Sequence, residues 1–135
     1  MIKWIDRTLM YGPRVALVTS ARDFRRALRD AGIADDGAWI ESHWHACTHA
    51  YDVDGVLVCI VAIDARKAAT QDPIDVASLL AHEAVHVWQR VAETLGGDVG
   101  REMPAYAIQN ICAHLMRAYR ATFSSAALGR VSRAS

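Results

Sequence analysis

The sequence predicts an α+β fold in which a small mixed sheet packs against one long helix that is followed by another. Short apolar, β-branched runs alternate with one helical stretch in the first half of the chain, and two long helical stretches follow in the second half. The hydrophobic fraction of 53% and the charged fraction of 22% are typical of a globular protein. With 135 residues the chain has the size of one domain, so we expect a single domain over residues 1–135.

The first helix is bounded by clear start and stop signals. Residues 15–19 form a short apolar, partly β-branched run, which predicts a buried strand. Ser20 follows as an N-cap, and apolar residues recur with helical spacing over 21–31. Gly32 then ends the helix.

A hairpin is predicted next. Residues 39–51 are expected to form one strand, and the turn at 52–55 carries an Asp-Gly pair that is typical of hairpins. The return strand, 56–63, is apolar throughout, which favours a central strand covered on both faces. Residues 64–71 are expected to be a connecting loop.

Two helices complete the predicted fold. Asp72 is a good N-cap and Pro73 a good first helical residue, and the helix should run to about residue 95, before two glycines. Most of its circumference is apolar, which predicts a helix buried across the domain. The next helix should begin near residue 101 or 102 and end near 121. The remainder, 122–135, is rich in Ala, Ser and Arg and is expected to be a frayed tail.

Composition excludes several classes of partner. The formal net charge is zero, with 15 basic and 15 acidic residues, so charge does not favour nucleic acid or an anionic membrane. No apolar run approaches the ~18 residues of a membrane span, and the N-terminus lacks the uninterrupted apolar core of a signal peptide. The three cysteines are odd in number and form no C-x-x-C pair. We therefore expect a soluble, cytoplasmic protein with reduced thiols.

The sequence His82-Glu83-Ala84-Val85-His86 is the main functional signal. Residues four apart lie on one face of a helix, so His82 and His86 can converge on one Zn²⁺ ion. Glu83 lies about 100° around the helix, where its carboxylate can reach a zinc-bound water without being a ligand. This arrangement suits a general base. The alternative is that His82 and His86 are structural residues in the core of a buried helix.

A catalytic zinc ion usually has three protein ligands, so a third ligand must come from elsewhere. Glu93 lies about 10.5 Å further along the helix axis than His86, which is too far to share the ion. Asp98, in a glycine-rich turn, is one candidate. Glu102 is favoured because it opens the second helix after a short chain reversal. Tyr106, one turn later, could donate a hydrogen bond to an oxyanion or simply pack at a helix interface.

A second histidine cluster falls in the predicted strand 39–51. His43, His45, Cys47 and His49 alternate there, so they would share one face of the sheet. If that face packs toward the motif helix, His45 or His49 could line the cleft and contact substrate. The alternative is that these residues are partly exposed polar side chains without a functional role.

The two motif segments resemble a known group of proteins. H-E-A-V-H-V-W-Q at 82–89 and E-M-P-A-Y-A-I-Q at 102–109 look like the small phage- or prophage-encoded HExxH metallopeptidase-like proteins, which are similar to minimal gluzincins. The resemblance covers residues 72–121 and implies a zincin-like domain. It also implies zinc ligands His82, His86 and Glu102, with Glu83 as the base. Gln89 and Ala92 depart from the longer H-E-x-x-H-x-x-G-x-x-H pattern of metzincins.

These observations predict a zinc-dependent metallopeptidase that cleaves a peptide or protein substrate. An alternative is a catalytically inactive, zincin-fold binding or assembly protein of phage origin, in which zinc is structural or absent. A third possibility is hydrolysis of a non-peptide amide, such as a bond in a cell wall.

Overall fold

The computed structural model describes residues 2–5, 12–34, 37, 39–41 and 44–131, with side chains described up to residue 124. Its helices and strands confirm an α+β protein with a mixed sheet. In chain order the elements are β1 (Trp4–Ile5), β2 (Arg14–Val18), α1 (Ala21–Ala31), β3 (Ala46–Val53), β4 (Val56–Ile63), α2 (Ala65–Ala68), α3 (Pro73–Leu95) and α4 (Glu102–Val131).

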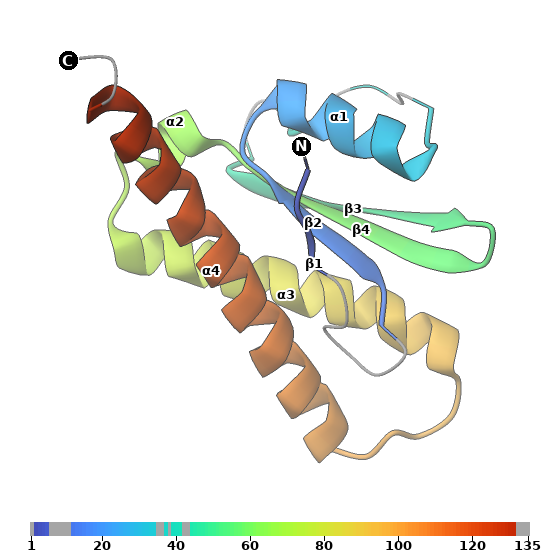
Figure 1. The fold of residues 1–135 in the computed structure, drawn as a ribbon. Coiled ribbons are helices and arrows are strands. Elements are labelled where there is room, and N and C mark those ends of the chain that lie inside the picture. Colours follow the sequence, from blue (N-terminus) through green and yellow to red (C-terminus); the bar gives the residue numbers. More distant parts are fainter. Residues whose placement is uncertain (1, 6–11, 35–36, 38, 42–43, 132–135) are drawn as a thin grey trace.

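The four strands are ordered β1-β2-β4-β3. The central strands β2 and β4 are parallel, and each outer strand runs antiparallel to its neighbour. Helix α1 covers one face of the sheet, while α3 and α4 lie on the other (Figure 1). Because both faces are covered, β4 is buried from Val58 to Ile63, as its continuous apolarity predicted. Strand β3 is left at an edge of the sheet.

The β3–β4 hairpin confirms the predicted turn. Asp54 and Gly55 have positive φ angles of 53° and 80°, the backbone geometry for which an Asp-Gly pair is favoured. The amide of Gly55 donates to Oδ1 of Asp52 at 2.9 Å. This turn sets a register in which Val53 pairs with Val56 and, at the far end of the hairpin, Ala46 pairs with Ile63.

Strand β3 begins at Ala46, so the prediction of a strand from residue 39 was wrong. The hairpin register explains the difference. Strand β4 ends at Ile63 because the side chain of Asp64 caps α2, accepting hydrogen bonds from the amides of Arg66 and Lys67. No β4 residue is therefore left to pair with a residue before Ala46. Helix α2 also replaces part of the loop predicted at 64–71.

The predicted caps of α1 and α3 are confirmed. Oγ of Ser20 accepts a hydrogen bond of 3.1 Å from the amide of Asp23, and Gly32 ends α1 in the left-handed conformation. Oδ1 of Asp72 accepts one of 2.8 Å from the amide of Ile74 at the start of α3. These local bonds fix the start of α3, and with it the rotational position of the motif.

Helix α3 is buried on one face only, which corrects the prediction of a helix buried across the domain. The sheet and α4 cover one side, and the opposite side faces solvent because no described element packs on it. Ile74, for example, is 74% exposed despite its apolar side chain. The buried face consists of Val76, Leu80, Glu83, Ala84, Val87, Trp88 and Val91.

Helix α4 begins at Glu102, as predicted, but it continues to Val131 instead of ending near residue 121. The prediction of a frayed tail from residue 122 was therefore wrong up to Val131, and residues 132–135 lie outside the described chain. Alanine-rich sequence propagates a helix readily once it has begun. Phe123 also contacts Tyr119 one turn earlier, with ring centroids 4.8 Å apart.

No helix among the described residues is long and apolar enough to cross a membrane.

Helix α4 crosses α3 at an angle instead of running alongside it (Figure 1). Three α4 residues spaced by one turn are buried in the shared core: Ala107, Ile111 and Leu115. The packing of α3 therefore depends on residues 107–115 of α4 and not on its first turn.

This packing predicts a large difference between two substitutions on α4. Ile111 is fully buried, so Ile111→Ala should lower the free energy of unfolding by about 2–5 kcal/mol through lost burial and a residual cavity. Tyr106 is 67% exposed, so Tyr106→Ala should change it by less than about 0.5 kcal/mol. Urea unfolding followed by circular dichroism measures both. Equal effects would contradict this placement of α4.

Candidate functional site

A cleft of about 1020 Å³ runs between the start of β3 and the exposed side of α3. The strand side of the cleft is formed by residues 44–48. The helix side carries the two histidines and the glutamate of the motif, together with polar residues on the turns before and after it: Asp75, Ser78, His82, Glu83, His86, Gln89, Arg90 and Glu93. The volume is at the upper end of the roughly 300–1,000 Å³ that is usual for ligand-binding pockets. The cleft therefore places the motif where a substrate can reach it.

His82 and His86 converge on one point in this cleft. Both side chains are exposed, so the alternative of two core histidines does not describe them. Their Nε2 atoms are 3.0 Å apart, and the rings meet nearly edge to face, with an interplanar angle of 80°. Helical spacing brings the residues together, and the rotamers aim the same nitrogen of each ring at the same place.

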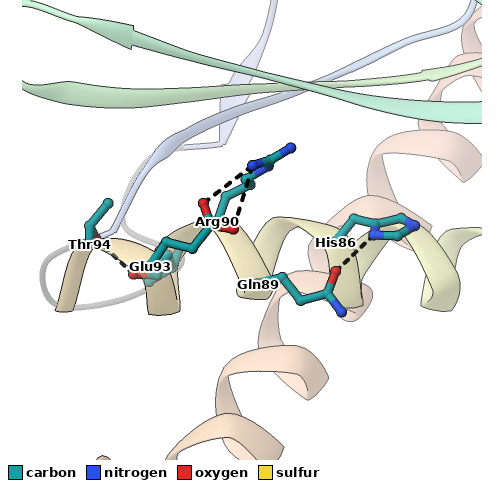
Figure 2. Close-up of polar contacts among 6 residues, drawn as sticks. His86, Gln89, Arg90, Glu93 and Thr94 are labelled. Carbon is teal, nitrogen blue, oxygen red and sulfur yellow. Dashed lines mark hydrogen bonds and ion pairs between the residues drawn. The ribbon is translucent and has the colours of Figure 1, made fainter. Parts of the chain in front are cut away.

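Gln89 determines which nitrogen of His86 is free. Nδ1 of His86 lies 2.9 Å from Oε1 of Gln89, and Figure 2 shows this contact along the exposed side of α3. A carbonyl oxygen only accepts hydrogen bonds, so Nδ1 must carry the proton. The neutral ring then has its lone pair on Nε2, the atom that faces Nε2 of His82. This tautomer is the one that a metal ligand needs.

The histidine pair has the donor chemistry of a zinc site. Two Zn–N bonds of 2.0–2.1 Å at a tetrahedral angle hold the nitrogens about 3.3–3.4 Å apart. The observed 3.0 Å differs from this by only a few tenths of an ångström. A third ligand is not assembled beside them, because the described residues contain no group of three His, Cys, Asp or Glu side chains that could hold a metal.

Glu83 lies at the base of the cleft and is only 4% exposed. Thr48, on β3, donates a hydrogen bond of 2.5 Å from Oγ1 to Oε2 of Glu83. The same hydroxyl lies 3.5 Å from the backbone carbonyl oxygen of Glu83. A buried carboxylate requires such a donor, since burial without a hydrogen bond is costly. The bond also ties the edge strand to the motif helix.

His45 lines the cleft, as predicted, but it precedes β3 instead of lying within it. Its Nδ1 accepts a hydrogen bond of 2.7 Å from Nε2 of Gln71, because an amide nitrogen only donates. The neutral ring then carries its proton on Nε2. In this tautomer Nε2 of His45 is a hydrogen-bond donor.

His49 does not lie in the cleft. Its Nε2 donates to the backbone oxygen of Trp39 at 2.7 Å, and its ring centroid is 4.6 Å from that of Phe24 on α1. These contacts are on the face of the sheet opposite α3, so the proposed substrate contact was wrong for this residue. The physical reason is strand alternation, which turns Thr48 toward α3 and His49 away from it. His43 lies outside the described residues.

Glu102 and Tyr106 are not brought to the histidine pair. Both are exposed on the first turns of α4, and neither lines the cleft. Tyr106 instead borders a separate hollow formed by α4 residues alone. The crossing of α4 over α3 accounts for this, because α4 packs through residues 107–115 and its first turn extends away from the motif. Glu102 therefore remains a ligand predicted from the sequence.

Burial raises the pKa of two thiols, that of Cys47 in the cleft and that of Cys59 in the core behind it. Burial raises the pKa of Cys47, and the carboxylates of Glu83 and Glu41 raise it further. Burial also raises the pKa of Cys59 to about 12, although the nearby Arg90 opposes the shift. A thiolate is the form that attacks a substrate or binds zinc. The raised pKa values lower the thiolate fraction of both cysteines at neutral pH, which disfavours both roles.

The remaining charges of the cleft on α3 are partly paired. Arg90 contacts Glu93 at 3.2 Å, an exposed ion pair one turn beyond the histidines (Figure 2). Glu93 is thus engaged away from the histidine pair, in agreement with the sequence argument against it as a ligand. An exposed pair of this kind contributes little to stability.

Three residues of the site were missed by the sequence analysis. Gln89 follows His86 by three positions, and this helical spacing could have identified it. Gln71 and Thr48 carry no comparable signal. Their contacts join residues 26 and 35 positions apart, and tertiary packing creates them: Thr48 of β3 meets Glu83 of α3, and Gln71 and His45 meet just before these elements begin.

Comparison of the chain with known protein families, curated proteins and solved structures finds no match. The site is therefore interpreted from its geometry.

Two glutamines of the cleft provide a matched test of metal binding. Gln89→Ala removes the acceptor that orients His86, so we expect zinc affinity to fall by about 10-fold. Gln71→Ala removes the corresponding contact of His45 and should leave zinc affinity unchanged. Competition with a chromophoric chelator measures both constants. An equal loss in the two variants would mean that His45 takes part in binding the metal.

Proposed function

We propose that this protein is a zinc-dependent hydrolase, most specifically a metallopeptidase that cleaves peptide bonds. The observation that carries the proposal is the convergence of the His82 and His86 Nε2 atoms, 3.0 Å apart, in an open cleft. The carboxylate of Glu83 lies at the base of the same cleft. Two imidazoles with an adjacent carboxylate are the groups that zinc-dependent hydrolysis requires.

His82 and His86 would hold the zinc ion through their Nε2 atoms. When bound, the ion polarises the carbonyl of the substrate and lowers the pKa of a water molecule toward about 7. Gln89 keeps His86 in the binding tautomer. His45 offers an N–H donor from the strand side of the cleft, where it could contact an oxygen of the substrate.

Glu83 would move the protons. It takes one proton from the attacking water while the water oxygen forms a bond to the peptide carbonyl carbon. When the C–N bond breaks, Glu83 delivers that proton to the departing amine nitrogen. The products are a carboxylic acid and an amine, and Glu83 returns to its ionised form.

The edge strand supports a peptide as the substrate. Among the described residues, strand β3 has a hydrogen-bonded neighbour on one side only, β4, and its first residues form a wall of the cleft. An extended peptide can add to such an edge through backbone hydrogen bonds. A sheet whose edge strand lies beside the motif helix also supports the finer assignment of a zincin-like fold.

The position of Glu102 favours a second candidate function. A ligand that stays on the first turn of α4, outside the cleft, would leave the histidine pair as an incomplete catalytic site. The cleft would then serve a binding or assembly protein on the same scaffold, in which zinc is structural or absent. Metal content and hydrolysis, measured on the same variants, separate the two candidates.

The hydrolase proposal predicts different losses for two substitutions in the motif. Glu83→Gln should abolish cleavage of unfolded casein while one zinc ion per chain remains bound, because it removes the base and keeps both histidines. His82→Ala should lose the zinc ion as well. Mass spectrometry of cleavage products and elemental analysis provide the two measurements.

Glu93→Gln serves as a control, since it removes a carboxylate of the same cleft that is paired with Arg90. It should leave cleavage unchanged. Full activity in Glu83→Gln would contradict the assignment of Glu83 as the general base. Zinc affinity in Glu102→Ala decides the remaining question: a loss places Glu102 at the metal, and no change leaves it outside.

A further inference from the structure

Thr48 is the one described side chain that hydrogen-bonds to the carboxylate of Glu83. The bond of 2.5 Å reaches Oε2 only. Within the described chain, no hydrogen bond reaches Oε1 of Glu83. Among the described residues, the one side-chain oxygen that is fully buried without a partner is Oε1 of Gln71. Oε1 of Glu83 is therefore not fully buried. Oε1 is therefore the carboxylate oxygen that remains accessible from the cleft.

We infer that Thr48 is a positioning residue for Glu83, which holds Oε2 against the edge strand so that Oε1 is the oxygen that accepts the proton. This inference rests on the proposed hydrolase function. It adds a residue from a distant part of the chain to the motif and assigns different roles to the two oxygens of one carboxylate.

The geometry makes Thr48 suitable for this task. Its backbone is fixed in β3, where it pairs with Val61 of the buried strand β4. Its β-branched side chain has few χ1 rotamers, so the direction of the hydroxyl follows from that of the strand. A hydroxyl has a single hydrogen, and the 2.5 Å contact with Oε2 is far shorter than the 3.5 Å contact with the Glu83 carbonyl.

This link also joins substrate docking to the base. Thr48 lies on the strand that would receive an extended peptide, and Glu83 lies on the helix that would hold the metal. A peptide that adds to the edge of β3 therefore meets a strand already bonded to the carboxylate. Such a support from a second element is what keeps a reacting group within a fraction of an ångström of its productive position.

Thr48→Val and Thr48→Ser test the role of the hydroxyl. Valine has nearly the same shape but no donor, so kcat should fall by about 10- to 100-fold with KM and zinc affinity unchanged. Serine restores the donor and should recover kcat to within about threefold of the wild-type protein. Steady-state kinetics on an internally quenched peptide, chosen from casein cleavage sites, provides both constants.

Thr122→Val is the matched control. It removes a part-buried threonine hydroxyl that bonds to the Ala118 carbonyl on α4, away from the cleft, and should leave kcat unchanged. Unchanged kcat in Thr48→Val would overturn the inference. So would a serine variant as impaired as the valine variant, or a loss that appears in KM alone.

A double-mutant cycle separates this inference from the proposed function. The effects of Thr48→Val and Glu83→Leu on the free energy of unfolding should not add, because the two side chains contact one another. Additive effects would overturn the inference even in an active enzyme. If the zinc-loaded wild-type protein cleaves nothing, the hydrolase proposal and the positioning role in catalysis both fail, and a non-additive cycle then identifies the contact as structural.

Discussion

Burial of a single face of α3 is the constraint on which the rest of the structure depends. One side of the helix packs against the sheet and α4, and the other must stay open for His82 and His86 to be reached. Glu83 lies at the boundary between the two sides. Its backbone belongs to the packed side, while its carboxylate needs both a protein partner and access to the cleft. The hydroxyl of Thr48 meets this requirement by satisfying one oxygen and leaving the other free.

Local features were predicted well because neighbouring residues determine them. The caps at Ser20 and Asp72 and the hairpin turn at Asp54-Gly55 each depend on a few adjacent residues. Helical spacing also places His82 and His86 on the same face of the helix. The start of β3 could not be predicted in this way, because it depends on where its partner strand ends, and that end is set by the cap of α2.

The placement of site residues beyond the motif depends on tertiary packing. Glu102 was expected beside the histidines on the assumption that α4 folds back along α3, whereas α4 crosses it. His49 was assigned to the cleft because the odd-numbered residues of the strand were expected to face α3. In the structure Thr48 faces α3, and His49 faces α1. Shifting a strand by one position exchanges its two faces. No pattern within a single segment contains the crossing angle of two helices or the face that a strand turns toward its neighbour.

The order of strands in the sheet has a consequence for how the chain reaches this fold. Strand β4 meets β3 through a tight turn, so that half of the sheet closes a very short loop. Strand β4 also pairs with β2, with Arg14 opposite Val58, and the chain between these two strands contains α1 and β3. This pairing therefore closes a much longer loop. Closing the longer loop costs more chain entropy, and contacts between distant residues form more slowly. We therefore expect the β3–β4 hairpin, which carries Thr48, to form before β2 pairs with the other side of β4.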